Sequence, residues 1–112
     1  MFLNGRHEVQ FDELVVRDGC KDDIEREALF FVLAGSDDLY VKASRIYDFE
    51  DRSIRPEALE GEVDLSSGSR ALVLLAFNLY NGWQASVTDI FTSLDENGRI
   101  LALEAIKLRF RI

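Results

Sequence analysis

The chain has 112 residues with 21 acidic and 13 basic side chains, which gives a net charge of −8 at pH 7. This length suits one domain, residues 1–112, because two smaller domains would each lack a sufficient core. The single cysteine, Cys20, excludes an intrachain disulfide and a cysteine-based zinc cluster. No apolar run approaches the roughly 20 residues that span a bilayer, and no signal-peptide pattern opens the chain. We therefore expect a cytoplasmic protein.

The first half of the chain predicts two helices. Apolar residues recur there at three- and four-residue spacing, which is typical of helices with one buried face. The first helix covers residues 5–17, with Asn4 as its N-cap and Gly19 just beyond its end. The second covers about residues 22–34. Its second half is apolar on every side, so we expect it to be buried.

The middle of the chain predicts one further helix, a loop and a short helical turn. Ser36 is placed to cap a helix over residues 37–47. Residues 48–55 show no clear period and are expected to form a loop. Pro56 suits the first position of a short helix that ends before Gly61.

The last part of the chain contains the strongest helix signal. Residues 67–81 lie between a serine cap and Gly82, and all of residues 71–80 except Asn78 are apolar, so they predict a buried central helix. A capping-box pattern then starts a short helix over residues 87–94. A final helix is expected from Arg99 towards Phe110. Because residues 107–112 alternate strictly between polar and apolar, an extended tail is an alternative.

Together these elements predict an all-α fold. We expect a compact single-domain bundle of about six helices around the buried central helix, residues 67–81.

The negative charge is concentrated in one part of the chain. Residues 1–64 carry 17 acidic and 8 basic side chains, a net −9, whereas residues 65–112 carry 4 and 5, a net +1. Such a balance disfavours direct nucleic-acid binding and favours a partner with a basic surface. The candidate partner-binding acidic face consists of Asp22, Asp23, Glu25, Asp37, Asp38, Asp48, Glu50 and Asp51. A purely solubilising role for these carboxylates is the alternative.

No arrangement of residues predicts catalysis or metal binding. None of the acidic clusters has the ligand and glycine spacing of an EF-hand loop, so no metal is expected. His7 is the only histidine and is expected at the surface, and no nucleophile elbow accompanies it. Cys20 precedes a helix start, which lowers a thiol pKa, and it lies beside Asp22 and Asp23, which raise it. Because these effects oppose each other, we expect an unreactive cysteine. We expect a protein that is not an enzyme and needs no cofactor.

Two further groups of residues are candidates for binding. Ser66, Ser67, Ser69 and Arg70 place hydroxyls, backbone N–H groups and a cation at a helix start, which is an arrangement that binds anions. Capping of the helix explains the serines equally well. Tyr80 and Trp83 lie at a helix end, where aromatic side chains often anchor protein interfaces.

The chain also resembles a known family. The motifs that carry the resemblance are residues 28–30, 34–40, 46–50, 54–57 and 69–82. They are similar to a small uncharacterised bacterial family, a domain of unknown function of about this length that is associated with mobile elements and prophages. The resemblance implies no activity, cofactor or site residues. It does imply a context in which small acidic proteins inhibit host defence.

These observations favour a non-enzymatic acidic module that binds a protein. Its sharper form is a phage or mobile-element anti-defence inhibitor, similar to an anti-CRISPR, that blocks the basic nucleic-acid-binding surface of a nuclease. One alternative is a small anion- or phosphate-ligand-binding protein or enzyme that uses residues 66–70. Another is a DNA-binding regulator that uses the basic C-terminal helix, through Arg99, Lys107, Arg109 and Arg111.

Overall fold

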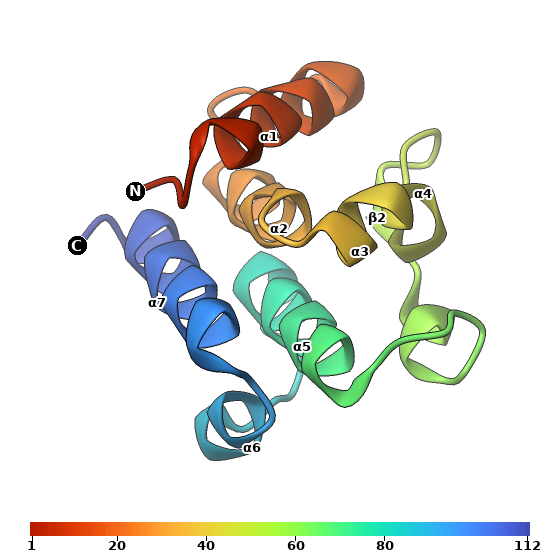
Figure 1. Ribbon diagram of the computed structural model, residues 1–112. Coiled ribbons are helices and arrows are strands. Elements are labelled where there is room, and N and C mark those ends of the chain that lie inside the picture. The colour runs from red at the N-terminus through yellow and green to blue at the C-terminus, as the bar shows by residue number, and fades with distance from the viewer.

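A computed structural model describes all 112 residues of the chain. It consists of seven α-helices, one 3-10 helix and a two-stranded antiparallel hairpin, which confirms the predicted helical fold class (Figure 1). None of the helices combines the length and apolar character needed to cross a membrane. In chain order the elements are α1 (Gly5–Asp18), α2 (Ile24–Ala34), α3 (Asp37–Val41), α4 (Ala43–Ile46), β1 (Tyr47–Asp48), β2 (Ser53–Ile54), η1 (Pro56–Leu59), α5 (Ser67–Asn81), α6 (Val87–Thr92) and α7 (Glu96–Phe110).

Side-chain caps fix the starts of the long helices. The Asn4 side chain accepts a hydrogen bond from the backbone N–H of His7 at 2.9 Å and so caps α1. Ser66 caps α5 through the N–H of Ser69 at 3.1 Å. At the other end of α5, Gly82 has a φ of 80°, a left-handed conformation that a side chain would oppose. These predicted boundaries are confirmed.

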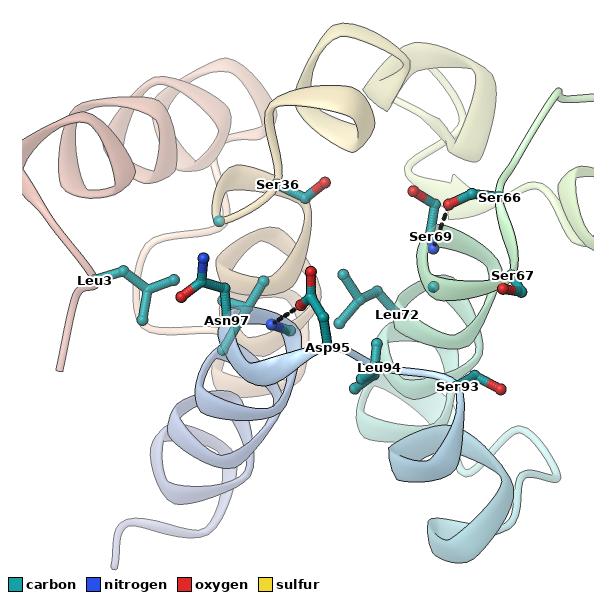
Figure 2. A pocket seen from close by; sticks show the side chains of 14 residues that line it. Leu3, Ser36, Ser66, Ser67, Ser69, Leu72, Ser93, Leu94, Asp95 and Asn97 are labelled. Carbon is teal, nitrogen blue, oxygen red and sulfur yellow. Dashed lines mark hydrogen bonds between the residues drawn. The ribbon is translucent and has the colours of Figure 1, made fainter.

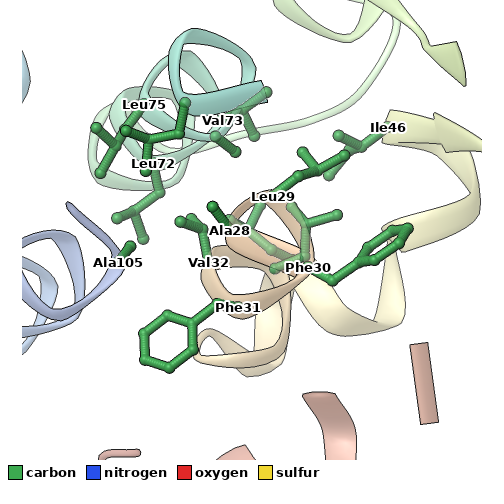
Figure 3. Packing of buried hydrophobic residues seen from close by; sticks show 14 of the residues in the cluster. Ala28, Leu29, Phe30, Phe31, Val32, Ile46, Leu72, Val73, Leu75 and Ala105 are labelled. Atoms are coloured by element: carbon green, nitrogen blue, oxygen red, sulfur yellow. The ribbon is translucent and has the colours of Figure 1, made fainter. Parts of the chain in front are cut away.

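The centre of the molecule is a pair of helices, α2 and α5. The predicted central helix, α5, is buried and packs against α2, α6 and α7. Helix α2 lies between α1 on one side and α5 and α7 on the other, and every residue from Ala28 to Ala34 is buried. Figure 3 shows Leu29 and Val32 of α2 facing Leu72 and Val73 of α5. A helix that is apolar on all sides is stable only in such a position.

The predicted helix over residues 37–47 is helical over most of its length but is divided into α3 and α4, and it ends one residue early, at Ile46. The helix breaks at Lys42, and Tyr47 leaves it to pair with Ile54 in the β1–β2 hairpin. The Tyr47 ring instead packs edge-on against Phe30, with centroids 4.9 Å apart. The hairpin forms inside the expected loop because Asp48 accepts hydrogen bonds from two backbone N–H groups in its turn, at 2.9 and 3.0 Å.

The last helix starts earlier than predicted and has no extended tail. Asp95 caps α7 by accepting the N–H of Gly98 at 2.7 Å, so the helix starts at Glu96 rather than at Arg99. The helix continues to Phe110 and ends at Arg111, whose φ is 57°. Leu101, Ala102 and Ala105 face the core, and this burial stabilises the helical period over the alternating one.

Candidate functional site

The starts of three helices, α3, α5 and α7, surround one open pocket of about 450 Å³ (Figure 2). Serines, glycines and short polar side chains from all three helix starts form most of its wall. The serines of the predicted anion site lie on this wall. The polar and small residues that line the pocket are Gly35, Ser36, Ser66, Ser67, Gly68, Ser69, Ser93, Asp95, Asn97 and Gly98.

The pocket lacks the cation that the predicted anion site included. The Arg70 guanidinium does not line the pocket and instead donates to the Leu59 carbonyl at 3.4 Å. The Ser69 hydroxyl donates to the Asp38 carboxylate just outside the wall at 3.0 Å, and Asp95 is the one carboxylate among the lining residues. Helix N-termini favour an anion, while these carboxylates oppose one. The geometry suits a small polar ligand with little negative charge.

Five of the eight carboxylates in the predicted acidic face are paired with cations of the same chain. The hydrogen bond from Lys42 holds the pKa of Asp38 below its ordinary value. Backbone N–H groups, the first of them that of Asp51, lower the pKa of Asp48 in the same direction. The five pairs are Asp23–Arg26 at 2.7 Å, Glu25–Arg109 at 3.8 Å, Asp37–Arg6 at 2.8 Å, Asp38–Lys42 at 2.7 Å and Asp48–Arg55 at 3.2 Å.

The eight carboxylates lie in two separate places. Residues 22–25 are at the start of α2, and the hairpin that carries residues 48–51 packs there, because Arg26 donates to the Arg52 carbonyl at 2.9 Å. Residues 37–38 follow the other end of α2. Its 11 residues separate the two places by about 16 Å. The structure therefore brings residues 22–25 and 48–51 together and leaves residues 37–38 apart.

The outer side of α1 carries an acidic surface that is not among the predicted sites. It consists of Glu8, Val9, Asp12 and Val16, all exposed, which we call the α1 face. The two valines are 65% and 79% exposed, and neither carboxylate forms an ion pair. Spacings of three and four residues place all four side chains on one side of the helix. That spacing is visible in the sequence, but the predicted acidic face was based on carboxylates that are neighbours in the chain, and Glu8 and Asp12 are not.

The candidate interface aromatics are both half-buried and take part in packing. Trp83 lies edge-on against Phe77, with ring centroids 5.7 Å apart. Its carbonyl accepts a hydrogen bond from the Asn78 side chain at 2.8 Å. The Tyr80 ring lies beneath the Arg26 guanidinium at 5.3 Å. These contacts explain both aromatic side chains without a partner.

His7 is buried, so its predicted surface position is wrong. Its Nε2 donates to the Phe31 carbonyl at 2.9 Å, and its Nδ1 accepts the N–H of Leu3 at 3.1 Å. The ring also packs against the rings of Phe2 and Phe31. Burial lowers the pKa of His7, although the bond to the Phe31 carbonyl opposes this effect. Both nitrogens are occupied, so the histidine serves packing rather than proton transfer.

A buried carboxylate, Asp18, lies at the centre of a polar cluster that no pattern in the sequence indicates. It accepts hydrogen bonds from the Tyr47 hydroxyl at 2.8 Å and from the Arg52 guanidinium at 3.1 and 3.3 Å. Burial, together with the Asp18 charge, raises the pKa of Cys20 to about 12. A thiol with this pKa is a poor nucleophile near neutral pH, in agreement with the predicted unreactive cysteine. Nowhere do three potential metal-ligating side chains converge.

The basic residues of α7 do not form an open stripe. Arg99 donates to the Phe91 carbonyl at 3.0 Å, and Lys107 pairs with Glu104 at 3.1 Å. Arg109 donates to the Leu79 carbonyl at 2.8 Å. These contacts direct three of the four cations predicted to read DNA towards the protein itself.

Comparison with known proteins places the chain in a family. The chain belongs to DUF6075, a family of unknown function, which it matches over residues 1–112. No curated protein and no solved structure matches it. The predicted resemblance to a domain of unknown function is thereby confirmed, while the association with mobile elements and prophages stays a prediction.

Proposed function

We propose that this DUF6075 protein is a non-enzymatic module that binds a basic surface of another protein through the α1 face. The observation that carries the proposal is the combination of two unpaired carboxylates with two exposed valines on one side of α1. Glu8 and Asp12 are one helical turn apart, so their like charges repel each other in the isolated protein. A basic partner would relieve that repulsion.

The two kinds of side chain would contribute differently to such a complex. The carboxylates would raise the association rate through long-range attraction, which salt screens. The valines would bury apolar area and slow dissociation. The protein's net charge of −8 adds to the attraction for any basic partner and opposes direct binding to nucleic acid.

The sharper form of the proposal is an anti-defence inhibitor, similar to an anti-CRISPR, that covers a nucleic-acid-binding surface. Its support is the acidic α1 face alone, since a surface that binds phosphates also attracts carboxylates. In this form, DNA or RNA and this protein would compete for the same partner. Adding increasing amounts of the partner's nucleic acid should therefore release increasing amounts of this protein from the partner.

Affinity capture with matched variants tests the proposal. The first variant combines Glu8→Gln with Asp12→Asn in the α1 face. The control combines Glu60→Gln with Asp64→Asn, two exposed carboxylates outside it, and has the same net charge. Bait proteins are incubated with a lysate of the encoding organism at about 0.05 and 0.5 M salt, the range over which screening becomes strong. Captured proteins are quantified by mass spectrometry.

We expect the wild type and the control to capture the same basic proteins at low salt. The α1 variant and high salt should each reduce this capture at least about tenfold, a loss of about 1.4 kcal/mol. Equal capture by the α1 variant and the control would contradict the proposal, because net charge alone would then explain binding.

A second candidate function is small-ligand binding in the pocket between the starts of α3, α5 and α7. The observation that favours it is the convergence of three helix N-termini on one space of about 450 Å³. Glucose, a small uncharged polar molecule, is a suitable probe, titrated while backbone amide signals are recorded by NMR. Saturable shifts at Ser67, Gly68 and Asn97 would support this function, and unchanged signals at millimolar glucose would oppose it.

A further inference from the structure

Helix α7 exposes a row of apolar side chains on its outer side. Ile100, Leu103 and Phe110 are 46%, 49% and 57% exposed. Their spacing of three and seven residues places them on one face, opposite Leu101, Ala102 and Ala105 in the core. We call these three exposed residues the α7 stripe. Scattered exposed apolar residues are ordinary, but a row on one helix face is typical of an interaction surface.

The α7 stripe continues into an apolar hollow between α5, α6 and α7. The hollow has a volume of about 170 Å³, and eight of its nine lining residues are hydrophobic. Phe110 belongs to both the stripe and the hollow. Val87 of α6 also lines the hollow and is 69% exposed. Figure 1 shows α6 and α7 together at one edge of the molecule, away from α3 and α4. A partner could therefore bury apolar side chains across both helices.

The charges on the exposed side of α7 differ between its two ends. Asp95 and Glu96 lie at its start and Arg111 lies at its end, and all three are exposed, whereas Lys107 near the end pairs with Glu104 of the same helix. Arg99 is turned away, because its guanidinium bonds to the Phe91 carbonyl of α6. The helix dipole has the opposite sign at each end, so an antiparallel neighbour also aligns favourably with it. A second α7 helix that runs in the opposite direction would therefore place its basic end beside the acidic end of the first.

We infer that the occupant of this surface is a second copy of the same chain. In the dimer, two α7 helices pack antiparallel about a two-fold axis near Leu103. Leu103 then meets its own symmetry mate, and Ile100 of one copy lies near Ile106 of the other. Glu96 of each copy lies beside Arg111 of the other. The inference does not depend on the α1 face, because α2 separates α1 from α7.

The size of the surface indicates a weak dimer. With 15 residues, α7 is about 22 Å long and about 10 Å wide. Even with the hollow beside α6, this area is at or below the roughly 800 Å² that each partner contributes to a standard interface. Self-association is therefore expected to depend on concentration in the micromolar range or above.

Sedimentation equilibrium of the whole protein tests this inference, at concentrations from about 1 to 500 µM. We expect the wild type to shift from monomer to dimer across this range. Leu103→Glu should weaken the dimer at least about tenfold, as the loss of a central apolar contact does. Val41→Glu is the matched control, because Val41 is 75% exposed on α3 and belongs to no proposed surface. It should dimerise like the wild type. Circular dichroism checks that both variants remain folded.

A charge exchange tests the antiparallel arrangement. Glu96→Lys and Arg111→Glu, made singly, should each weaken the dimer because each places like charges together across the axis. The double variant restores opposite charges and should recover most of the lost affinity. A wild type that stays monomeric at 500 µM, unchanged dimerisation of Leu103→Glu, or a double variant weaker than either single one would overturn the inference.

Discussion

At the scale of single residues, His7 shows how burial fixes a protonation state. The ring lies among Phe2, Phe31 and Leu3, and only a neutral imidazole can accept the N–H of Leu3 while it donates to the Phe31 carbonyl. Protonation would break the first of these bonds and bury a charge. Burial accordingly lowers the pKa of His7. The free energy of unfolding therefore depends on the protonation of His7.

The free energy of unfolding should therefore fall in mildly acid solution. The unfolded chain binds a proton near pH 6.5, whereas folded His7 binds one only at lower pH. Stability is complete above about pH 6.5 and is lost as pH falls towards the lowered pKa, by at most about 1.4 kcal/mol per pH unit. Urea unfolding between about pH 7.5 and 5 measures this slope. His7→Gln should lower stability at pH 7.5 and flatten the slope, and an unchanged slope would assign the effect to other groups.

Asp18 is the residue whose loss should be most disruptive among the carboxylates. Its side chain is fully buried and joins α1 to the hairpin through Tyr47 and Arg52. Burial, followed by the hydrogen bond to Asp18, raises the pKa of Tyr47 to about 12, so the hydroxyl remains a donor. This network satisfies every buried side-chain polar atom near it. It holds the hairpin against the helical core.

Asp18→Asn should destabilise the protein by about 3 kcal/mol, because removing one member of a buried charged network leaves the others unpaired. Urea unfolding near neutral pH measures the change. Asp12→Asn, on the exposed side of the same helix, is the control and should change stability by less than about 0.5 kcal/mol. Similar effects from both substitutions would mean that the Asp18 network contributes little.

At the scale of elements, the start of α3 illustrates why acidic residues need not form a binding face. Asp37 and Asp38 occupy the first turn, where the helix dipole favours negative charge. Asp37 pairs with Arg6 of α1, and Asp38 pairs with Lys42. Each carboxylate therefore has a cation partner within the chain, whereas Glu8, which also lies in a first helical turn, and Asp12 have none.

Replacing Asp37 and Asp38 together with lysine should lower the melting temperature. The lysines would oppose the dipole of α3 and repel Arg6 and Lys42, a loss of about 1 kcal/mol in total. Differential scanning calorimetry measures the shift, and the Glu8→Gln, Asp12→Asn variant serves as the comparison that should not be destabilised. A double lysine variant as stable as the wild type, with reduced capture of basic proteins, would instead place the binding face at α3.

At the scale of the whole molecule, one core depends on the contact between α2 and α5. The molecule measures 32 × 30 × 24 Å, and the two helices pass through its centre. Leu29 and Val32 of α2 are fully buried against this contact (Figure 3). Surface helices such as α1 and α7 each pack on α2. A substitution that disturbs the packing of α2 should therefore weaken its contacts with α1, α5 and α7.

Leu29→Ala should destabilise the protein by about 2 to 5 kcal/mol, because it removes buried methyl groups and leaves a cavity. Urea unfolding gives the change in free energy. Val41→Ala, which shortens an exposed side chain, should alter stability by less than about 0.5 kcal/mol. If the two variants were equally stable, the α2–α5 contact would not be the centre of the core.

The amino-acid sequence determined the features that depend on neighbouring residues. The caps at Asn4 and Ser66 and the left-handed glycine at Gly82 are local, so their positions could be predicted. The same is true of the buried helices α2 and α5, whose apolar residues leave no solvent-exposed face. Of the candidate site, the sequence correctly located the serines at the start of α5.

Tertiary structure decided what depends on residues far apart in the chain. The burial of His7 needs the Phe31 carbonyl, and the break near Lys42 lets Tyr47 reach Asp18, 29 positions away. Long-range pairing also decided which carboxylates remain available. Arg6 and Arg109 pair with acidic residues of other helices, while Glu8 and Asp12 form no ion pair. Sequence spacing records only local contacts, and a charge acquires its role from the partner that folding brings beside it.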